Sequence, residues 1–206
     1  MSDPTSPSAV ASREVEDGGT IVYISEFFSR EEADALFANL QQNIAWKQER
    51  GPFGHSFPRL TALYADAGVT YTYSGVTYPS LMWTPELDAV RRRVEQAAAA
   101  PFNSVLLNRY RDGSDSIGFH ADDEPELGLN PIVPSISLGS RRRFVLRHKK
   151  SKKKIEYELT HGSLLIMGGT LQHFWLHSLP KTAQPVGERI NLTFRNIVPV
   201  SERRKG

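Results

Sequence analysis

Apolar and polar residues alternate without a break near the C-terminal end of the chain, over residues 189–195. Side chains along a β-strand point to opposite faces in turn, so this alternation predicts a strand with one apolar and one polar face. The polar face carries Arg189, Asn191, Thr193 and Arg195. Such a face is typical of an edge strand in contact with water, but two guanidinium groups with no acid between them also suit an anionic ligand.

Short segments of strand character, separated by Gly, Pro, Asn and Asp, fill the chain after Pro101. The expected strands are 103–110, 116–122, 132–138, 143–148, 155–159, 163–167, 173–178 and 188–198. Many short strands at this spacing predict a sandwich or a jelly-roll barrel.

Two helices are expected before these strands. The first begins at Ser29, where Glu32 completes a capping box, and the second begins at Thr84 with Pro85 at its first helical position. The apolar residues expected to face the core are Ala35, Leu36, Leu40 and Ile44 in the first helix and Leu87, Val90 and Val94 in the second. The pattern predicts an α+β fold with a jelly-roll core flanked by N-terminal helices.

The composition is that of an ordinary globular protein, with 206 residues, 39% of them hydrophobic and 23% charged. The chain has no cysteine, which excludes disulfides, thiolate-bound zinc, iron–sulfur clusters and cysteine nucleophiles. A metal site must therefore use His, Asp, Glu or backbone oxygen. The sequence has no run of about 18 apolar residues, so we expect no membrane span.

The uneven composition along the chain predicts one domain with two short tails. Residues 1–18 are rich in Ser, Pro, Ala and acids and are expected to form a disordered tail. The folded domain is expected over residues 19–200, followed by a basic tail over 201–206. Between Arg141 and Lys154 there are nine Lys or Arg and no acid. This stretch is typical of a solvated surface or of a contact with an anionic polymer.

His120 and Asp122 are two residues apart, which on a strand or at its end directs an imidazole and a carboxylate to one point. With a distant histidine they would form a facial triad, which leaves three metal positions open. The candidates for the third ligand are His55, His148, His161, His173 and His177. We expect His148 on the surface and His161 in a turn, whereas His173 and His177 share a face if their segment is extended. Periodicity alone leaves both of these open.

Four motifs in order make the chain similar to a known family. They are Asn108-Arg109-Tyr110-Arg111-Asp112-Gly113, His120-Ala121-Asp122, Trp175-Leu176-His177-Ser178-Leu179-Pro180 and the strand from Arg189 to Arg195. Together they resemble the AlkB family of iron(II)- and 2-oxoglutarate-dependent nucleic-acid dioxygenases, and within it the AlkB homologue 2 branch of duplex DNA repair enzymes. The resemblance extends from about Ile21 to Ile197 and implies a double-stranded β-helix.

The resemblance implies a role for each matching residue near the metal. His120, Asp122 and His177 would bind Fe(II), and His177 is selected over His173 because the family ligand precedes Ser-Leu-Pro. The residues that would contact the cosubstrate 2-oxoglutarate are Asn108, Tyr110, Arg189, Asn191, Thr193 and Arg195. Of these, Arg189, Tyr110 and Asn191 would bind its distal carboxylate. Arg195 and Asn108 would lie nearer the metal.

The resemblance also implies contacts to a nucleic-acid substrate. Phe53 matches a phenylalanine that fills the gap left by a flipped base, although the loop is shorter here and Phe57 is the alternative. The implied pocket residues are Tyr71, Tyr73, Ser74, Asp123 and Glu124. Arg59 and the stretch from Arg141 to Lys154 are the expected phosphate contacts.

The activity implied by the resemblance is O2-dependent oxidative demethylation of 1-methyladenine and 3-methylcytosine in DNA, with release of formaldehyde, succinate and CO2. Demethylation of RNA by the same chemistry and a non-catalytic nucleic-acid-binding β-barrel are the alternatives. We expect a monomer with DNA, single- or double-stranded, as its partner, RNA as the alternative partner, and no membrane. We expect an intracellular location, in the nucleus of a eukaryote or otherwise in the cytoplasm.

Overall fold

The computed structural model describes residues 10–51, 54–73, 76–78 and 80–198, and side chains within 71–79 are outside this description. Its largest element is an eight-stranded sheet of order β1-β2-β12-β9-β14-β7-β3-β6. In this order the strands are Val10–Val15, Gly19–Ile24, Ser163–Gly169, Val133–Gly139, Arg189–Arg195, Ser104–Tyr110, Leu60–Ala65 and Ser80–Leu81. All neighbours are antiparallel except β3 and β6.

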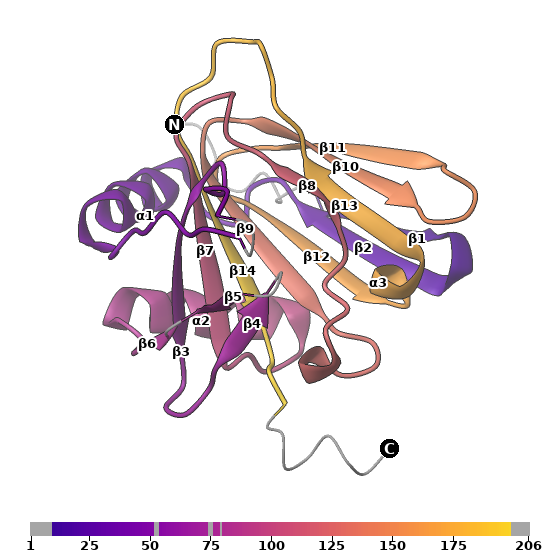
Figure 1. Ribbon diagram of the computed structural model, residues 1–206, viewed down its shortest axis with the longest axis horizontal. Helices are drawn as coiled ribbons and strands as arrows, with labels where there is room; N and C mark the ends of the chain where they lie inside the picture. The colour runs from indigo at the N-terminus through magenta and orange to yellow at the C-terminus, as the bar shows by residue number, and fades with distance from the viewer. Residues whose placement is uncertain (1–9, 52–53, 74–75, 79, 199–206) are drawn as a thin grey trace, which may run out of the picture.

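A second sheet of four antiparallel strands, in the order β11-β10-β13-β8, covers part of one face of the large sheet (Figure 1). Its strands are Lys154–Leu159, Arg142–His148, Trp175–Leu179 and Ile117–His120. The remaining elements are the hairpin β4 Tyr71–Tyr73 and β5 Val76–Tyr78, the 3-10 turns η1 Glu16–Gly18 and η2 Pro125–Leu127, and the short helix α3 Leu171–Phe174. The two facing sheets confirm the predicted jelly-roll core.

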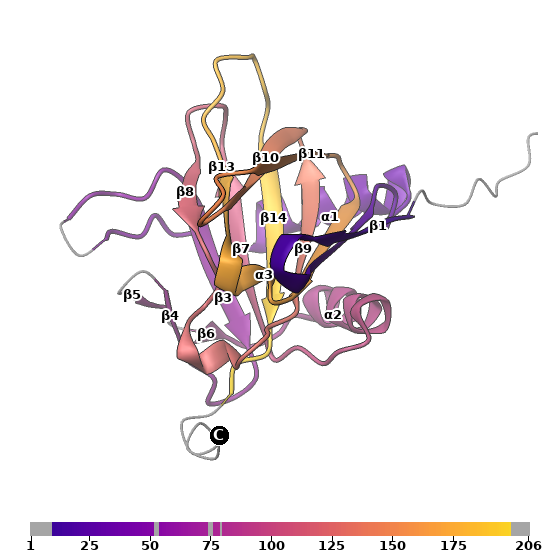
Figure 2. The same cartoon turned by 90° about the vertical axis from the view of Figure 1, so that its right-hand side faces the viewer.

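Helices α1 Arg30–Asn43 and α2 Pro85–Ala98 lie on the opposite face of the large sheet (Figures 1 and 2). Both caps form as predicted. The Ser29 hydroxyl accepts the Glu32 N–H at 3.2 Å while the Glu32 carboxylate accepts the Ser29 N–H at 2.8 Å, and Thr84 caps α2. The apolar face of α1 differs from the prediction in one position, because Ala35 is exposed and Ala33 is buried in its place.

Two apolar clusters hold these layers together. The helices and the outer face of the large sheet share one cluster, which includes Leu40, Leu87, Val94, Leu107 and Leu192. The second fills the space between the two sheets and includes Ile21, Phe144, Leu146, Leu165 and Trp175. Burial of such side chains, worth about 1.5–3 kcal/mol each, fixes the two sheets that carry the site. No helix in the described ranges is long and apolar enough to cross a membrane.

The predicted disordered tail over residues 1–18 is wrong for its second part. Residues 1–9 lie outside the described residues, but β1 and η1 are ordered, and β1 pairs with β2 along its whole length. Asp17 Oδ2 lies 2.8 Å from His148 Nε2, and the Trp175 indole donates to the Glu16 carbonyl at 3.1 Å. Because nearly all side chains of β1 are exposed, the segment has the polar composition of a tail although its backbone is paired. The predicted tail over 201–206 lies outside the described residues.

Candidate metal centre and anion-binding cavity

Three potential metal ligands meet at the paired strands β13 and β8 of the small sheet and the loop that follows β8. β13 pairs with β8 so that His177 lies opposite His120 in register, and their ring centroids are 4.2 Å apart. Asp122 follows β8, and its Oδ2 is 3.7 Å from His177 Nε2. One ligand atom from each of His120, Asp122 and His177 lies within 4.8 Å of the other two. Strand pairing therefore brings together residues that are 57 positions apart.

The carboxylate of Asp122 is held on one side only. Arg195 Nη2 donates to its Oδ1 at 2.7 Å, and the backbone N–H of Asp122 donates to the Gln172 side-chain oxygen at 3.0 Å. Its Oδ2 is buried and has no hydrogen-bond partner among the described residues. Burial raises the pKa of Asp122, but Arg195 and the two histidines outweigh this effect and lower the pKa to about 2. The group is therefore ionised at neutral pH with one oxygen available to a cation.

Both imidazoles are neutral at neutral pH. The pKa of His177 is lowered to about 3, mainly by burial and to a smaller extent by the neighbouring His120. Burial also lowers the pKa of His120. His120 Nδ1 lies 2.8 Å from the Gly118 carbonyl. Donation from Nδ1 makes Nε2 the nitrogen that offers a lone pair to a metal, because histidines that bind metals commonly donate their other ring N–H to a carbonyl or carboxylate oxygen.

The donor set fits Fe(II). Two neutral imidazoles and one monodentate carboxylate on one side of an ion are typical of non-haem Fe(II) oxygenases, and they leave positions open for other ligands. The buried Oδ2 of Asp122, which accepts no hydrogen bond in the described part of the chain, is the observation that supports a cation here, because an ionised oxygen without a hydrogen-bond donor is costly in a protein interior.

The polar face of β14 lines a cavity beside this cluster. All seven residues of β14 are buried, because the strand lies between β9 and β7 in the middle of the large sheet. The interpretation of this segment as an edge strand facing water is therefore wrong. The cavity is lined by polar residues of three neighbouring strands together with the two histidines, namely Asn108, Tyr110, His120, Ser135, His177, Arg189, Asn191, Thr193 and Arg195.

Arg189 is a positively charged residue of this cavity and suits an anionic ligand. Its side chain is 2% exposed, one Nη donates to Ser137 Oγ at 2.7 Å, and the guanidinium packs 5.3 Å from the centre of the Tyr110 ring. Its Nε has no hydrogen-bond partner and no acid pairs with it among the described residues. Burial lowers its pKa to about 10, so the group remains charged at neutral pH. A buried, unpaired cation fits the carboxylate of a bound ligand such as 2-oxoglutarate.

Asn191 and Thr193 form the wall of the cavity. The Asn191 amide donates to Ser135 Oγ at 2.7 Å and to the Ile136 carbonyl at 2.9 Å, and Thr193 Oγ1 donates to Asn191 Oδ1 at 2.9 Å. These hydrogen bonds fix the part of the cavity wall between Arg189 and Arg195. Both residues line the cavity, but their side-chain polar atoms already form hydrogen bonds with other protein groups.

The residues predicted to contact a base lie partly outside the described residues. Phe53 and Ser74 are outside them, and for Tyr71 and Tyr73 the structure describes only the backbone of β4. Among the others, Glu124 turns its Oε2 into a buried position without a partner in the described part of the chain. Burial and the negative charge of Asp122 raise the pKa of Glu124 to about 7.

Asp123 is more exposed, and the Lys149 ammonium reaches its carboxylate at 3.3 Å. The same ammonium donates to the Gln172 carbonyl at 3.0 Å. Lys149 therefore connects the end of β10 to the residues that follow Asp122.

Arg59, which was predicted to contact phosphate, is a buried residue. Its side chain is 3% exposed, and its Nε donates to Asn108 Oδ1 at 2.8 Å inside the protein. A side chain buried in this way offers little of its surface to a nucleic-acid backbone. No local pattern indicates this burial, because an arginine next to a proline loop is usually exposed.

The other histidines divide differently from the prediction. His148 is buried rather than on the surface, because its ring is held between Asp17 and Ser151. His161 lies in a turn as predicted. His173 belongs to α3 and points to Asn130 at 3.0 Å, so it does not share a face with His177.

Sequence reasoning missed Gln172, Ser135 and Ser137. Gln172 is 1% exposed and supports the backbone of Asp122 from the helical turn α3. No sequence signal indicates this role, since the predicted strand 173–178 begins after Gln172 and the helical turn α3 was not expected. Ser135 and Ser137 alternate with apolar residues on β9, and this alternation could have placed them on the inner face with Arg189.

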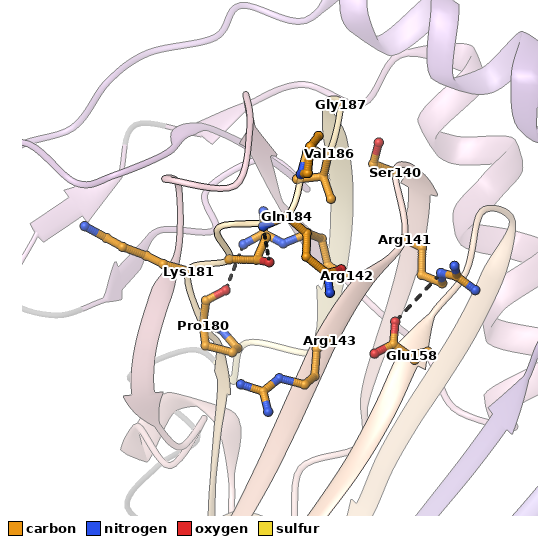
Figure 3. Close-up of a pocket in the computed structure, with 12 residues that line it drawn as sticks. Ser140, Arg141, Arg142, Arg143, Glu158, Pro180, Lys181, Gln184, Val186 and Gly187 are labelled. Atoms are coloured by element: carbon orange, nitrogen blue, oxygen red, sulfur yellow. Dashed lines mark hydrogen bonds and ion pairs between the residues drawn. The ribbon is translucent and has the colours of Figure 1, made fainter.

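The basic stretch from Arg141 to Lys154 is only partly available to a ligand. Figure 3 shows Arg141, Arg143 and Lys181 around an outer pocket of about 840 Å³ between the start of β10 and the loop 180–187. Arg142 in the same pocket is committed to the protein, because its guanidinium donates to three backbone carbonyls at 2.8–3.0 Å. Arg141 pairs with Glu158 at 3.8 Å and Arg143 pairs with Glu156 at 3.4 Å, and both pairs are exposed.

Comparisons with known proteins agree with this geometry. Residues 20–195 match the model of the 2OG-Fe(II) oxygenase superfamily. The chain is 42% identical over 191 residues to the DNA oxidative demethylase ALKBH2 of Bos taurus, which covers 85% of this chain and 68% of the relative. It is 39% identical over 186 residues to the alpha-ketoglutarate-dependent dioxygenase alkB homolog 3 of Rattus norvegicus, over 84% of this chain and 62% of the relative.

A relative in Arabidopsis thaliana, also named DNA oxidative demethylase ALKBH2, is 34% identical over 230 residues, covering 96% of this chain and 73% of the relative. Among solved structures, OsALKBH1 superposes with a TM-score of 0.66 at 18% identity, over 90% of this chain and 100% of that chain, which shows the shared fold. The superfamily uses Fe(II), 2-oxoglutarate and O2, and the chain belongs to its AlkB family, close to the ALKBH2 members.

Proposed function

We propose that this protein is an oxidative demethylase that repairs N-methylated bases, 1-methyladenine and 3-methylcytosine, in DNA. The observation that carries the proposal is the position of His120, Asp122 and His177 beside a cavity whose buried Arg189 has no acidic partner among the described residues. The names of the relatives, DNA oxidative demethylases at 34–42% identity, support DNA as the substrate.

The protein's own residues bind and orient the reactants. His120, Asp122 and His177 would hold the iron through two neutral nitrogens and one ionised oxygen. Arg189, with Tyr110 beside it, would bind the distal carboxylate of 2-oxoglutarate, while Arg195 and Asn108 line the end of the cavity nearer the metal. When bound, Fe(II) with 2-oxoglutarate and O2 supplies the oxidant that hydroxylates the N-methyl carbon, and 2-oxoglutarate leaves as succinate and CO2.

The hydroxymethyl group formed on the base nitrogen then leaves as formaldehyde. Its hydroxyl proton is released, and the electron pair of the broken C–N bond returns to the ring nitrogen as the lone pair of the repaired base. One oxygen atom of O2 enters the succinate and the other enters the formaldehyde, so the reaction balances. Burial of Asp122, His177 and Arg189 keeps the reacting atoms away from bulk water, which protects the oxidant from side reactions.

A methyl group on the pairing edge of a base is inaccessible in a duplex, so the base must leave the helix to reach the site. Glu124 lies beside the metal cluster with its Oε2 buried and unpaired in the described part of the chain, where it would accept a hydrogen bond from an exocyclic amine of the flipped base. Arg141, Arg143 and Lys181 are cations that would meet the phosphates, since the exposed ion pairs of Arg141 and Arg143 contribute little.

All ligands of the site come from one chain, which supports a monomeric enzyme. A substrate in genomic DNA supports an intracellular location, in the nucleus of a eukaryote or otherwise in the cytoplasm.

The direct test supplies Fe(II) and 2-oxoglutarate to the protein with oligonucleotides that carry 1-methyladenine or 3-methylcytosine. We expect equal amounts of repaired base, formaldehyde and succinate from DNA, and none from a His120→Ala variant. Matched duplex DNA, single-stranded DNA and RNA substrates identify the preferred nucleic acid. Turnover of RNA alone, or unchanged turnover by His120→Ala, would contradict the proposal.

A further inference from the structure

Arg59 is unusual for a charged residue because its side chain is almost fully buried and contacts a residue of the cosubstrate cavity. It lies just before β3, and β3 pairs with β7 so that Thr61 is opposite Asn108. The Arg59 Nε–H donates to Asn108 Oδ1 at 2.8 Å. The two side chains are 3% and 5% exposed, so this bond is shielded from competing water.

Both the backbone next to Arg59 and its guanidinium group are held in place by other residues. The Ser116 N–H donates to the Pro58 carbonyl at 3.0 Å, which connects this segment to the residues before β8. The Phe57 ring packs against the guanidinium, 5.1 Å from its central carbon. Arg59 therefore approaches Asn108 from a rigid position rather than from a free loop.

The hydrogen bond determines which end of the Asn108 amide faces the cavity. Arginine has only donors, so its partner must be the amide oxygen. The Asn108 Nδ2 group, with two donors, is then the end left for a ligand. An anionic carboxylate requires donors, and an amide turned the other way would present an oxygen to it and an N–H to Arg59.

Arg59 also lines a surface groove that reaches the metal cluster. The groove is formed by residues 57–59 and 116–120 and includes the side chains of Phe57, Phe119 and His120. The residue therefore stands between the open groove and the closed cavity.

We propose that Arg59 is a positioning residue for the cosubstrate: by holding the oxygen of Asn108, it keeps the Asn108 amide donor directed at the carboxylate of 2-oxoglutarate nearer the metal. The inference rests on the proposed function, because it takes 2-oxoglutarate as the ligand of the cavity. It replaces the predicted phosphate contact of Arg59 with a role inside the protein.

The test measures 2-oxoglutarate affinity without turnover, by anaerobic calorimetry on the Mn(II)-loaded protein, together with KM and kcat for 2-oxoglutarate and for the oligonucleotide. Arg59→Leu is expected to weaken 2-oxoglutarate binding about tenfold, the size of one charge-assisted hydrogen bond. Arg59→Lys is expected to recover part of this loss. Arg30→Leu, at an exposed arginine of α1, is the matched control and should change nothing.

Asn108→Asp tests the direction of the amide. The carboxylate retains an acceptor for Arg59 but presents a negative oxygen to the ligand, so we expect a loss about tenfold larger than that of Arg59→Leu. In an Asn108→Ala background, Arg59→Leu should cost less than about twofold, because the amide that it orients is gone.

Three results would overturn the inference. They are unchanged 2-oxoglutarate affinity in Arg59→Leu and Arg59→Lys, a raised KM for the oligonucleotide alone, and additive losses in the double variant. If Arg59→Leu does not fold, Arg59→Lys and Asn108→Asp carry the test. A wild-type protein that binds no 2-oxoglutarate would contradict the proposed function itself, which separates the two failures.

Discussion

Arg195 donates a hydrogen bond of 2.7 Å from Nη2 to Oδ1 of Asp122, although the two residues are 73 positions apart in the chain. The bond joins β14, in the middle of the large sheet, to the loop that follows β8. It occupies one carboxylate oxygen and leaves the other, Oδ2, for the metal. The same arginine lines the cosubstrate cavity, so one side chain links the two halves of the site.

Replacement of Arg195 by Leu should therefore damage both stability and metal binding. Asp122 is fully buried, and loss of one partner of a buried ion pair costs about 3–5 kcal/mol. The pKa of Asp122 should rise, since Arg195 is the largest influence that lowers it. Urea unfolding and Fe(II) titration measure the two effects. Arg143→Leu, which removes an exposed pair with Glu156, is the control and should stay within about 0.5 kcal/mol of wild type.

The metal-free protein should lose stability as the pH falls below about 6.5, which is the pKa of histidine in an unfolded chain. The folded protein holds the pKa of His177 at about 3, so between these values the unfolded chain binds a proton that the folded chain does not. The contribution is fully present above pH 6.5 and declines by roughly 1 kcal/mol per pH unit below it. Denaturant unfolding with a chelator at pH 7.5, 6 and 5 measures the slope, which should be shallower in His177→Gln. Equal slopes would refute the assignment.

Gln172→Leu should weaken Fe(II) binding by about 10- to 100-fold, as expected when a group that supports a metal ligand is removed. The reason is the bond from the Asp122 N–H to the Gln172 oxygen, which fixes the loop after β8. Anaerobic titration with Fe(II) measures the affinity. His173→Ala changes the adjacent, exposed residue of α3 and should bind iron as the wild type does. If both variants bind iron equally well, Gln172 has no such role.

Phe53→Ala should reduce repair of duplex DNA more than repair of single-stranded DNA. An apolar side chain that fills the gap left by a flipped base matters only where a base stack must be kept open. The comparison of initial rates on matched duplex and single-stranded substrates tests this prediction, with Phe57→Ala in parallel. A duplex-specific loss in Phe57→Ala alone would move the role to Phe57, and equal losses on both substrates would remove it.

The C-terminal half of the fold was predictable because its strands carry a local signal. Alternation over 189–195 and the spacing of turn residues located β7 to β14 to within a few residues. The strand β3 and the hairpin strand β1 were missed for opposite reasons. β3 is buried along almost its whole length and has no alternation, whereas β1 is exposed and resembles a tail.

Long-range partners explain the remaining differences. Nothing near His148 in the sequence indicates that Asp17 covers it, and nothing near Arg59 indicates Asn108. Likewise, periodicity could not separate His173 from His177, because the helical turn α3 interrupts the strand between them. The family motif, rather than the pattern of the residues, selected His177.

The most direct test of the account is a crystal structure of the protein with Mn(II) and 2-oxoglutarate, with the metal located by its anomalous scattering. The account predicts one site in the barrel, with the metal within about 2.0–2.3 Å of His120, Asp122 and His177, and the distal carboxylate of the ligand on Arg189. A metal bound elsewhere, or held without His177, would contradict it.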